Sequence, residues 1–299
     1  MSRWNFFYVR AHGRVAVCTV SLVVILLLLL QTFLGALVLF DHKEEQLSFE
    51  VVRAGHAEGQ NSIQRLDSVL SYSLYGSSKR YTDGAIANSK LYRMIYPGWD
   101  MLVYHDNSVP AHVLTSLHGN GVMLINMTGS KLAKSTWRFT AASDHHVLRV
   151  CSRDSDSRLS AREKAAVDEW IQSSKKFHVM RDHPSHSRRQ HPMCAGMWCA
   201  VGDAIRDMTD RLYQHNLTDE YFQDQDFLSQ VVWPFARESV LQHDSFSCDK
   251  YDGAIPFPTP RDGLEHVGSV YIDGKMRQED VDVLKQATVP AACAKIRRD

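Results

Sequence analysis

The 299-residue sequence lacks an excess of charge of either sign, because 34 Lys and Arg balance 34 Asp and Glu. Binding the phosphates of nucleic acid needs clustered, excess Lys and Arg, so this balance argues against a nucleic-acid partner. Charged residues make up 23% of the chain and hydrophobic residues 44%, which excludes a disordered chain and one embedded wholly in a membrane. The length suits one large domain or two small ones.

Internal repeats, low-complexity tracts and glycine-rich phosphate loops are also absent, and Gly119-Asn120-Gly121 marks only a turn. Long hydrophobic runs are absent too, with the exception of VAVCTVSLVVILLLLLQTFLGALVLF at residues 15–40. About 20 apolar residues suffice for a helix to cross a membrane, so this run is long enough. A cleaved signal peptide would have about 7–15 apolar residues before a small-residue cleavage site, and no clear site follows here. The run therefore predicts a transmembrane signal anchor.

The charges beside this run predict its direction in the membrane. Three arginines precede it, whereas the residues that follow it, DHKEE, are mainly acidic. Under the positive-inside rule, residues 1–14 form a cytosolic tail, 15–40 the anchor, 41–65 a polar stem and 66–299 a lumenal domain. We therefore expect a single-pass type II protein of the Golgi or endoplasmic reticulum membrane.

Two sequons fit a lumenal domain. Asn126-Met127-Thr128 and Asn216-Leu217-Thr218 match the acceptor pattern for N-glycosylation, although such triplets also arise by chance. Asn126 and Asn216 are therefore the predicted attachment sites.

The cysteines are compatible with the same compartment. Apart from Cys18 in the predicted anchor, five remain, and an odd number leaves at least one thiol free or intermolecular. Cys194 and Cys199 are close enough in sequence to form a disulfide, and Cys248 with Cys293 is a second possible pair. The sequence does not decide the connectivity.

From residue 66 onward, predicted strands and helices alternate. The strands cover residues 68–76, 101–106, 121–127, 146–156 and 177–182, and the helices 82–96, 109–117, 135–144 and 160–171. The pattern loosens after residue 190, where helices are predicted near 197–209 and 219–232. Strict alternation predicts an α/β fold with a mainly parallel sheet covered by helices on both faces. In such sheets ligands bind at the carboxyl ends of the strands.

The segment Arg153-Asp154-Ser155-Asp156-Ser157-Arg158 lies at one of these strand ends. Mg²⁺ and Mn²⁺ favour carboxylate oxygens, so Asp154 and Asp156 are candidate metal ligands. Arg153 and Arg158 can meet phosphate by forked hydrogen bonds. The alternative is a solvated turn with two acids at the entry to a helix, because Asp-x-Asp occurs often by chance.

In this context the sequence resembles the nucleotide-sugar glycosyltransferases of the GT-A fold. It is similar, more narrowly, to a group of predicted glycosyltransferases with RDxDSR and MRDHP motifs, and the resemblance covers roughly residues 66–250. The family's fuller GGMWG stands here as AGMWC, so this loop departs from the pattern. The matching segments, in order, are YSLYG (72–76), IYPGW (95–99), WRF (137–139) with Asp144, RDSDSRLSAREKAAVDEW (153–170), FHVMRDHP (177–184), GMW (196–198), Asp224-Gln225 and His243-Asp244.

The resemblance implies roles for individual residues. Asp154, Asp156 and His243 would hold Mn²⁺ or Mg²⁺, and Asp224 would orient an acceptor hydroxyl or act as catalytic base. The implied donor-binding residues are Tyr75, Gly76, Trp137, Arg138, Asp144, Arg153, Arg158, Arg181, Asp182 and His183. The implied reaction moves a sugar from a nucleotide-sugar donor to a glycan, protein or lipid acceptor, as in hexosyltransferases.

Physical chemistry supports these roles and leaves alternatives open. A leaving nucleoside diphosphate gains negative charge that a metal ion and arginines stabilise. An inverting enzyme also needs a carboxylate such as Asp224 to accept the acceptor proton, whereas a retaining enzyme does not. The plainer interpretation of Asp224 is an exposed acid that stabilises the start of a helix.

Three rival interpretations remain. The donors for a structural zinc site crowd together (His183, His186, His191, Cys194 and Cys199), but their spacing matches no tight zinc motif. The second rival is a non-catalytic membrane protein that binds carbohydrate or nucleotide on the same scaffold. The third rival is a metal-dependent phosphoesterase, which would hydrolyse phosphate esters without any sugar acceptor.

Overall fold

The computed structural model describes residues 66–187 and 191–294. Its main element is an eight-stranded sheet with the strand order β3-β2-β1-β4-β6-β5-β7-β8. The strands are β1 (Leu66–Leu74), β2 (Asp100–His105), β3 (Met123–Asn126), β4 (Val147–Arg153), β5 (Phe177–Arg181), β6 (Met197–Val201), β7 (Val240–Asp244) and β8 (Ala254–Ile255).

The prediction of a mainly parallel sheet is confirmed. All the pairings within the sheet are parallel except those of β6, which runs antiparallel to both β4 and β5. The helix predicted near residues 197–209 is wrong, because β6 occupies its first part. Trp198 packs into one core and Cys199 into the other, which is the two-residue alternation of a strand. A short apolar run such as MWCAV does not distinguish a buried strand from a helix by period alone.

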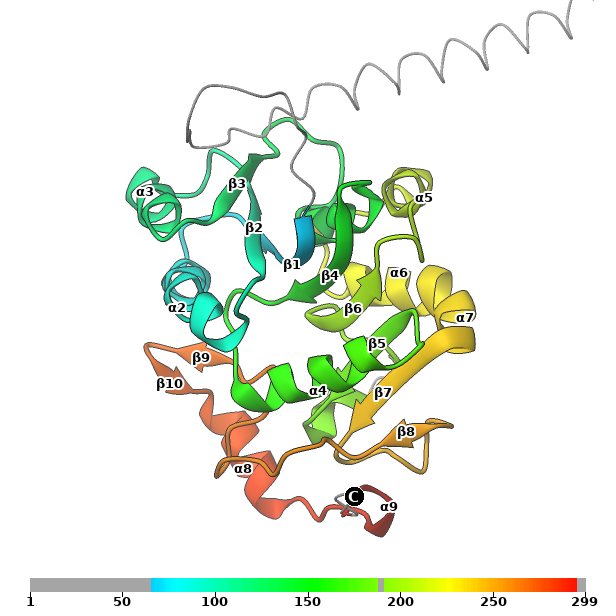
Figure 1. Ribbon diagram of the computed structural model, residues 1–299. Coiled ribbons are helices and arrows are strands. Elements are labelled where there is room, and N and C mark those ends of the chain that lie inside the picture. Colours follow the sequence, from blue (N-terminus) through cyan, green and yellow to red (C-terminus); the bar gives the residue numbers. More distant parts are fainter. Residues whose placement is uncertain (1–65, 188–190, 295–299) are drawn as a thin grey trace, which may run out of the picture. The chain divides into compact units, whose positions relative to one another are not determined.

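Helices cover both faces of the sheet (Figure 1). On one face lie α2 (Lys79–Ile95), α3 (Ala111–Gly119) and α4 (Ala161–Gln172), and on the other lie η1 (Lys134–Ser143), α5 (Met208–His215), α6 (Gln223–Phe227) and α7 (Trp233–Ala236). A π-helical turn, η3 (Leu228–Val232), joins α6 to α7, and two short 3₁₀ turns are η2 (Pro184–Ser187) and η4 (Arg237–Ser239). Ser160 caps the start of α4, because its hydroxyl accepts from the Glu163 amide at 3.2 Å.

Each face of the sheet has its own hydrophobic core. Along β1, Val69 belongs to the core under η1 and α5, whereas Leu70 belongs to the core under α2 and α4. Trp198 and Trp170 are buried, one in each core, so packing accounts for both. Helices cover both faces of the sheet, so ligands reach it at the ends of its strands and not at its faces.

The C-terminal part of the described chain crosses those strand ends. It comprises the hairpin β9 (Tyr271–Ile272) and β10 (Lys275–Met276), followed by α8 (Gln278–Gln286) and α9 (Ala291–Ala294). The amide of Tyr271 donates to the Asp156 carbonyl at 2.8 Å. This contact joins the hairpin to the segment that follows β4.

Two disulfides connect distant segments. Cys248–Cys293 is confirmed and joins the segment after β7 to α9. The pair Cys194–Cys199 is wrong, because Cys199 is bonded to Cys151 and Cys194 is a buried free thiol. The physical reason is the strand register, which places Cys151 of β4 directly opposite Cys199 of β6.

No helix among the described residues has the length and apolar character needed to cross a membrane. The cytosolic tail, the anchor and the stem predicted for residues 1–65 lie outside the described residues. The type II topology therefore stays a prediction.

Candidate functional site

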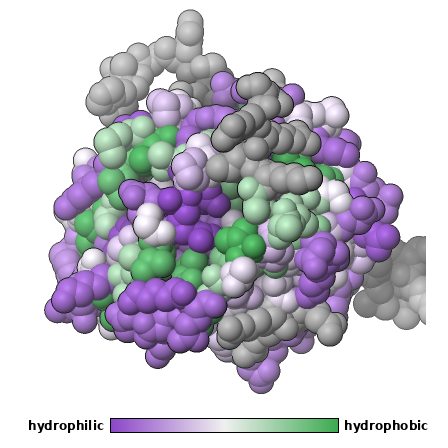
Figure 2. Space-filling view, turned by 90° about the horizontal axis from the view of Figure 1, so that it is seen from below, coloured by the Kyte–Doolittle hydropathy of each residue, from purple (hydrophilic) through white to green (hydrophobic). Residues whose placement is uncertain are grey.

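A cavity of about 1040 Å³ lies at the carboxyl ends of β1 and β4. Its wall includes residues that follow these two strands, residues at the start of α2 and α6, and residues of the segment before α8. Seen from below, the molecule has hydrophilic side chains in a central hollow, with hydrophobic patches beside it (Figure 2). Six of the residues predicted for catalysis, metal binding or donor binding line the cavity, namely Tyr75, Gly76, Arg138, Asp154, Asp156 and Asp224.

Asp154 and Asp156 both face this cavity, but they are paired differently. Asp156 is only 7% exposed, and its Oδ2 accepts from Arg80 Nε at 2.7 Å. The side chain of Asp154 is 43% exposed, and its Oδ1 accepts from Arg138 Nη1. Burial raises the pKa of Asp156, and the charge of Asp154 raises it further. The two carboxylates thus repel each other in a partly desolvated place.

Local backbone features hold the two aspartates at the strand end. The Asp154 carbonyl accepts from the hydroxyl of Ser157 at 2.9 Å, which closes a turn. Gly196 leaves room for the Asp154 carboxylate, because a Cβ at that position would lie 2.1 Å from Asp154 Oδ2. Gly84 similarly lets α2 approach the Ser155 carbonyl. Two glycines therefore shape the space around the Asp-x-Asp segment.

Asp224 joins the same group of charges. Its Oδ2 accepts from Arg138 Nη2 at 3.0 Å, so one guanidinium contacts both Asp224 and Asp154. Burial raises the pKa of Asp224, although Arg138 partly opposes this effect. The predicted acid at the start of a helix is therefore a buried residue of the cavity wall. We call Asp154, Asp156 and Asp224 the acidic wall.

Tyr75 and Gly76 lie where β1 ends, as predicted. Gly76 has φ +72°, a backbone conformation that favours glycine, and its amide donates to Ser108 Oγ at 2.7 Å. The ring of Tyr75 is half exposed and packs edge-on against buried Trp137, with 6.0 Å between the ring centres. Trp137 thus supports the cavity wall from behind and does not line it.

The part of the cavity wall that the structure describes is acidic. Within residues 66–187 and 191–294, the wall holds three arginines and six carboxylates, a balance of three minus six, or −3. The arginines are Arg80, Arg138 and Arg277, and the carboxylates are Asp154, Asp156, Asp219, Glu220, Asp224 and Asp280. Such a cavity repels a diphosphate unless a cation enters with it.

Several predicted donor-binding residues lie outside the cavity wall. Arg153 is buried against Glu163, with 2.8 Å from Nε to Oε1, and Arg181 is buried against Asp244 at 2.6 Å. Arg158 lies over the ring of Tyr271 at 4.7 Å. These arginines stabilise the fold around the cavity and do not face into it.

Asp144, Asp182 and His183 are also placed elsewhere. Asp144 accepts from the His146 amide at 2.8 Å and ends η1. Asp182 is buried among arginines, and His183 Nε2 lies 3.0 Å from the Asp280 carbonyl. None of the three is among the residues that line the cavity.

His243 is not brought to the predicted metal ligands. It is fully buried, its Nδ1 lies 2.8 Å from His178 Nε2, and its Nε2 lies 3.1 Å from Glu169 Oε2. Among the described residues, no metal-sized group of donors combines His243 with Asp154 or Asp156. The reason is the strand order, since two strands, β6 and β5, separate β7 from β4.

The donors named for a zinc site do not converge either. Cys199 is in a disulfide, and among the described residues the donors that do come together are His183 and His186 with His266, and Asp244 with the disulfide-bonded Cys248 and Cys293. The sequons, by contrast, are accessible, because Asn126 and Asn216 are both exposed. Their glycosylation stays a prediction.

Sequence reasoning missed part of the wall. Arg80, Tyr81, Tyr221, Phe222, His266 and Arg277 all line the cavity. Phe222 has φ +76°, which is unusual for a bulky residue and typical of functional sites. The start of α2 offered one signal, since a helix that follows a strand end places its first residues beside the ligand. His266 and Arg277 lie in a segment without sequence periodicity and gave none.

Comparisons with known proteins show likeness of structure only. No family model matches the sequence, and no curated protein matches it. A mannosyltransferase from Pyrobaculum calidifontis, solved with GDP-mannose and Mn²⁺, is 10% identical, with 74% of this chain and 64% of that chain covered and a TM-score of 0.42.

Two further solved structures were matched. Glucosyl-3-phosphoglycerate synthase from Mycobacterium tuberculosis is 13% identical, with coverage of 60% and 69% and a TM-score of 0.37. A 4-diphosphocytidyl-2C-methyl-D-erythritol synthase from Anaerococcus prevotii is 12% identical, with coverage of 60% and 89% and a TM-score of 0.40. Likeness at this level does not establish a shared activity, so the function rests on the site.

Proposed function

We propose that this chain is a metal-dependent glycosyltransferase that moves a sugar from a nucleotide-sugar donor to a glycan, protein or lipid hydroxyl. The observation that carries the proposal is the placement of Asp154 and Asp156 together in the wall of a large acidic cavity at the strand ends. The cavity volume, about 1040 Å³, is at the upper end of the range for small-molecule sites and suits a nucleotide sugar.

The residues fit a hard divalent cation. Asp154 and Asp156 offer carboxylate oxygens, which Mg²⁺ and Mn²⁺ prefer, and Asp154 is exposed enough to change partners. A cation between them would remove the repulsion that raises the pKa of Asp156. When bound, such an ion neutralises charge that develops on a leaving diphosphate.

Two arginines supply the remaining positive charge. Arg80 and Arg138 now pair with the aspartates, and both line the cavity. The buried Nε of Arg138 has no hydrogen-bond partner within the described part of the chain. If a cation takes over the carboxylates, these guanidinium groups become available to phosphate oxygens, for which their fork is suited.

Asp224 is the candidate general base. It is buried in the cavity wall beside Arg138, and its raised pKa brings it closer to the pKa expected of a base at neutral pH. In this role its carboxylate accepts the proton of the acceptor hydroxyl as that oxygen forms its bond to the anomeric carbon of the sugar, while the bond from that carbon to the diphosphate breaks and the nucleoside diphosphate leaves. An inverting reaction needs this step. The proposal for Asp224 therefore includes inversion.

The proposed location is the lumen of the Golgi or endoplasmic reticulum. The support for it is the predicted anchor at residues 15–40 with its preceding arginines, two exposed sequons and two disulfides. All of these fit a domain on the oxidising side of the membrane.

The test uses the full chain, purified in detergent. Binding of UDP, GDP, CMP and their sugar derivatives is measured by calorimetry with Mn²⁺ and with EDTA. We expect one nucleotide class to bind only with Mn²⁺, and Asp156→Asn to weaken that binding about 100-fold. Asp210→Asn is the matched control, since Asp210 is an exposed acid on α5, and its binding should match the original protein.

The outcomes separate the proposal from its rivals. Metal-independent binding that survives Asp156→Asn would contradict the metal site and favour a carbohydrate- or nucleotide-binding protein. Hydrolysis of a simple phosphate ester, lost in Asp156→Asn, would favour the phosphoesterase. Transfer of a sugar from the bound nucleotide to an acceptor would support the proposed activity directly.

A further inference from the structure

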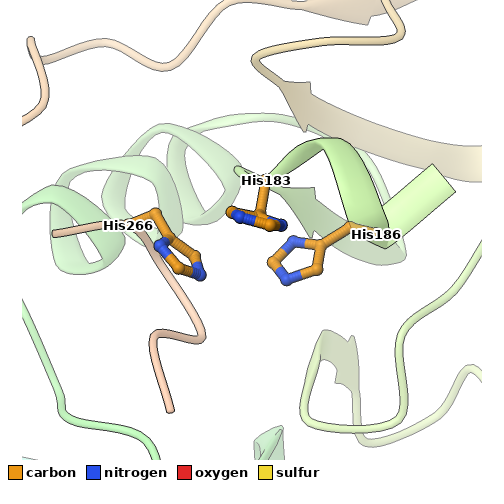
Figure 3. A group of neighbouring side chains, drawn as sticks. All are labelled: His183, His186 and His266. Carbon is orange, nitrogen blue, oxygen red and sulfur yellow. The ribbon is translucent and has the colours of Figure 1, made fainter. Parts of the chain in front are cut away.

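Three histidine side chains lie close together beside the cavity. Unlike the acidic wall, this group contains no carboxylate. His183 directly precedes η2, His186 lies within it, and His266 comes from the segment before β9 (Figure 3). The distances between ring centres are 4.5 Å for His183 and His266, 5.6 Å for His183 and His186, and 5.7 Å for His186 and His266. We call these residues the histidine cluster. His186 and His266 line the cavity, whereas His183 does not.

Hydrogen bonds assign the proton on His186. Its Nδ1 lies 3.1 Å from the backbone amide of Asp182, and an amide N–H can only donate. Nδ1 must therefore offer its lone pair. In the neutral ring the proton is then on Nε2.

The same reasoning applies to His183. Its Nδ1 accepts from the Ser185 amide at 3.1 Å, so its Nε2 carries the proton and donates to the Asp280 carbonyl at 3.0 Å. Both nitrogens of this ring have partners in the protein. His183 therefore supports the cluster from behind.

His266 has a hydroxyl as its local partner. Its amide donates to Ser269 Oγ at 2.8 Å, and the same Oγ lies 2.9 Å from His266 Nδ1. A hydroxyl that accepts from the amide has its own proton to donate, and Nδ1 is the acceptor within reach. In the tautomer in which this hydroxyl donates to Nδ1, the ring proton of His266 is on Nε2 as well.

Neither ring that faces the cavity is charged at neutral pH. Burial lowers the pKa of His186 well below its usual range, and the neighbouring His266 and His183 lower it further. Burial and His183 lower the pKa of His266 to about 4. Two imidazolium groups side by side would repel each other, so the neutral state is consistent with the geometry.

This arrangement is the reverse of a metal site. A histidine that binds a metal offers a lone pair to the ion and donates its other N–H to the protein. Here the protein's amide and hydroxyl groups donate to Nδ1, so the nitrogens that remain are N–H donors. The convergence of three rings alone would suggest a metal, but the hydrogen bonds favour a group that accepts.

The charges nearby indicate what kind of acceptor fits. Arg277 and Asp280 line the same part of the cavity and neutralise each other, with 2.7 Å and 3.0 Å between guanidinium and carboxylate. Among the described residues, this side of the cavity thus presents N–H donors without net charge. Such donors suit the uncharged oxygens of hydroxyl groups better than phosphate, which needs positive charge.

We propose that His186 and His266 form a sugar-binding subsite, in which their Nε2–H groups donate to hydroxyl oxygens of a pyranose. The proposal rests on the proposed function and deepens it, since it divides the cavity into an acidic part for the nucleotide's metal-bound diphosphate and a neutral part for a sugar. The shared chemistry is that of sugar hydroxyls, whether they belong to the donor or to the acceptor.

Asp182 positions both loops of this subsite. Its backbone amide donates to His186, and its carboxylate accepts from the amide of Val267 at 3.0 Å, next to His266. The aspartate of the MRDHP motif therefore holds other residues in place and does not itself contact a ligand in the cavity. This aspartate does not line the cavity but holds the two residues that do.

The experiment has two arms, both with the full chain in detergent. In the first, calorimetry with Mn²⁺ compares UDP with UDP-glucose and GDP with GDP-mannose. In the second, saturation-transfer NMR measures binding of the methyl glycosides of glucose, mannose, galactose and xylose to the protein loaded with Mn²⁺ and nucleoside diphosphate. Each is performed with His186→Phe, which removes the donor, and with His186→Gln, which keeps an N–H donor.

We expect His186→Phe to reduce the sugar-dependent part of the affinity roughly five- to tenfold, as for one hydrogen bond, while affinity for the bare diphosphate stays within twofold. His186→Gln should restore part of the loss. A loss in the first arm assigns the subsite to the donor sugar, and a loss in the second arm assigns it to the acceptor sugar. Far-ultraviolet circular dichroism shows whether each variant is folded.

Two results would overturn the subsite. The first is that the original protein shows no sugar-dependent affinity, or that this affinity is unchanged in folded His186→Phe and His266→Phe. The other is stoichiometric binding of Zn²⁺ or Co²⁺ without nucleotide that requires both histidines, which would make the cluster a metal site. If no nucleotide binds at all, the proposed function itself fails, and this outcome is distinct from both.

Discussion

Two strand ends of this sheet carry the same dipeptide and use it in opposite ways. Arg153 ends β4 and Asp154 follows it, and Arg181 ends β5 and Asp182 follows it. In both, the arginine is buried and 1% exposed, paired to an acid within the fold. The aspartates differ, since Asp154 lines the cavity and Asp182 is fully buried.

The difference lies in how completely each carboxylate is satisfied. Asp182 accepts from Arg162 at 2.8 Å, from Arg261 at 2.8 Å, from the Ser245 hydroxyl and from the Val267 amide. Among the described residues, Asp154 pairs with one guanidinium, that of Arg138, and its side chain is 43% exposed. A carboxylate with every lone pair used stabilises a fold, whereas one with capacity left is able to bind a ligand. Substitutions at and beside the two carboxylates test that distinction.

The largest effect is expected for Asp182→Asn. Removing this charge leaves the guanidinium groups of Arg162 and Arg261 partly unpaired in a buried place, and breaking a buried pair costs about 3–5 kcal/mol. Urea unfolding followed by tryptophan fluorescence measures the loss. A cost below about 1 kcal/mol would mean that Asp182 is not the structural aspartate of the two.

The pH dependence of the stability gives a second test of Asp182. Arginines and hydrogen bonds hold the pKa of Asp182 well below its usual range despite its burial. A lowered pKa contributes stability that is present above the unfolded value of about 3.9 and is lost as pH falls toward the folded value. The stability gap between the original protein and Asp182→Asn should therefore be largest near neutral pH and narrow below about pH 4.

A smaller effect, on binding, is expected for Gly196→Ala. The added Cβ would lie 2.1 Å from Asp154 Oδ2, so the exposed carboxylate must turn away. We expect Mn²⁺-dependent nucleotide affinity to fall roughly tenfold, or about 1.4 kcal/mol, as calorimetry would show. Gly119→Ala is the matched control, because a Cβ there meets nothing within 4 Å. Equal affinities in the two variants would contradict the role of Asp154.

The smallest effect is expected for Tyr75→Ala. Its half-exposed ring, supported by Trp137, offers one edge of the cavity to a nucleotide base. Loss of one aromatic contact is worth about 0.5–1.5 kcal/mol, so we expect nucleotide affinity to fall about threefold. Tyr75→Phe keeps the ring and should bind like the original protein. A similar loss in Tyr75→Phe would assign the contact to the hydroxyl instead.

The sequence predicted the sheet and part of the site for identifiable reasons. Strand and helix periods in residues 68–182 predicted the elements that bring Tyr75, Arg138 and Asp154 together. Adjacent residues at a strand end point to opposite faces, and the sequence alone does not say which one faces a ligand. Arg153 and Arg181, which the resemblance implies as donor-binding residues, prove to be buried.

Long-range placement explains the remaining differences. His243 was matched by its late position in the chain, but the order of strands takes it to His178 and Glu169. His266 reaches the cavity through an irregular segment, which no periodicity in the sequence predicts. Such contacts depend on topology and on loops, which local patterns do not encode.

The most direct test of the account is the amount of Mn²⁺ that the full chain binds in the presence of its nucleotide. Electron paramagnetic resonance of free Mn²⁺ measures this in the original protein, in Asp156→Asn and in Asp210→Asn. We predict one nucleotide-dependent Mn²⁺ per chain in the original protein and in Asp210→Asn, and none at the same concentration in Asp156→Asn. Full retention of the ion in Asp156→Asn would contradict the claim that the aspartates after β4 are the metal site.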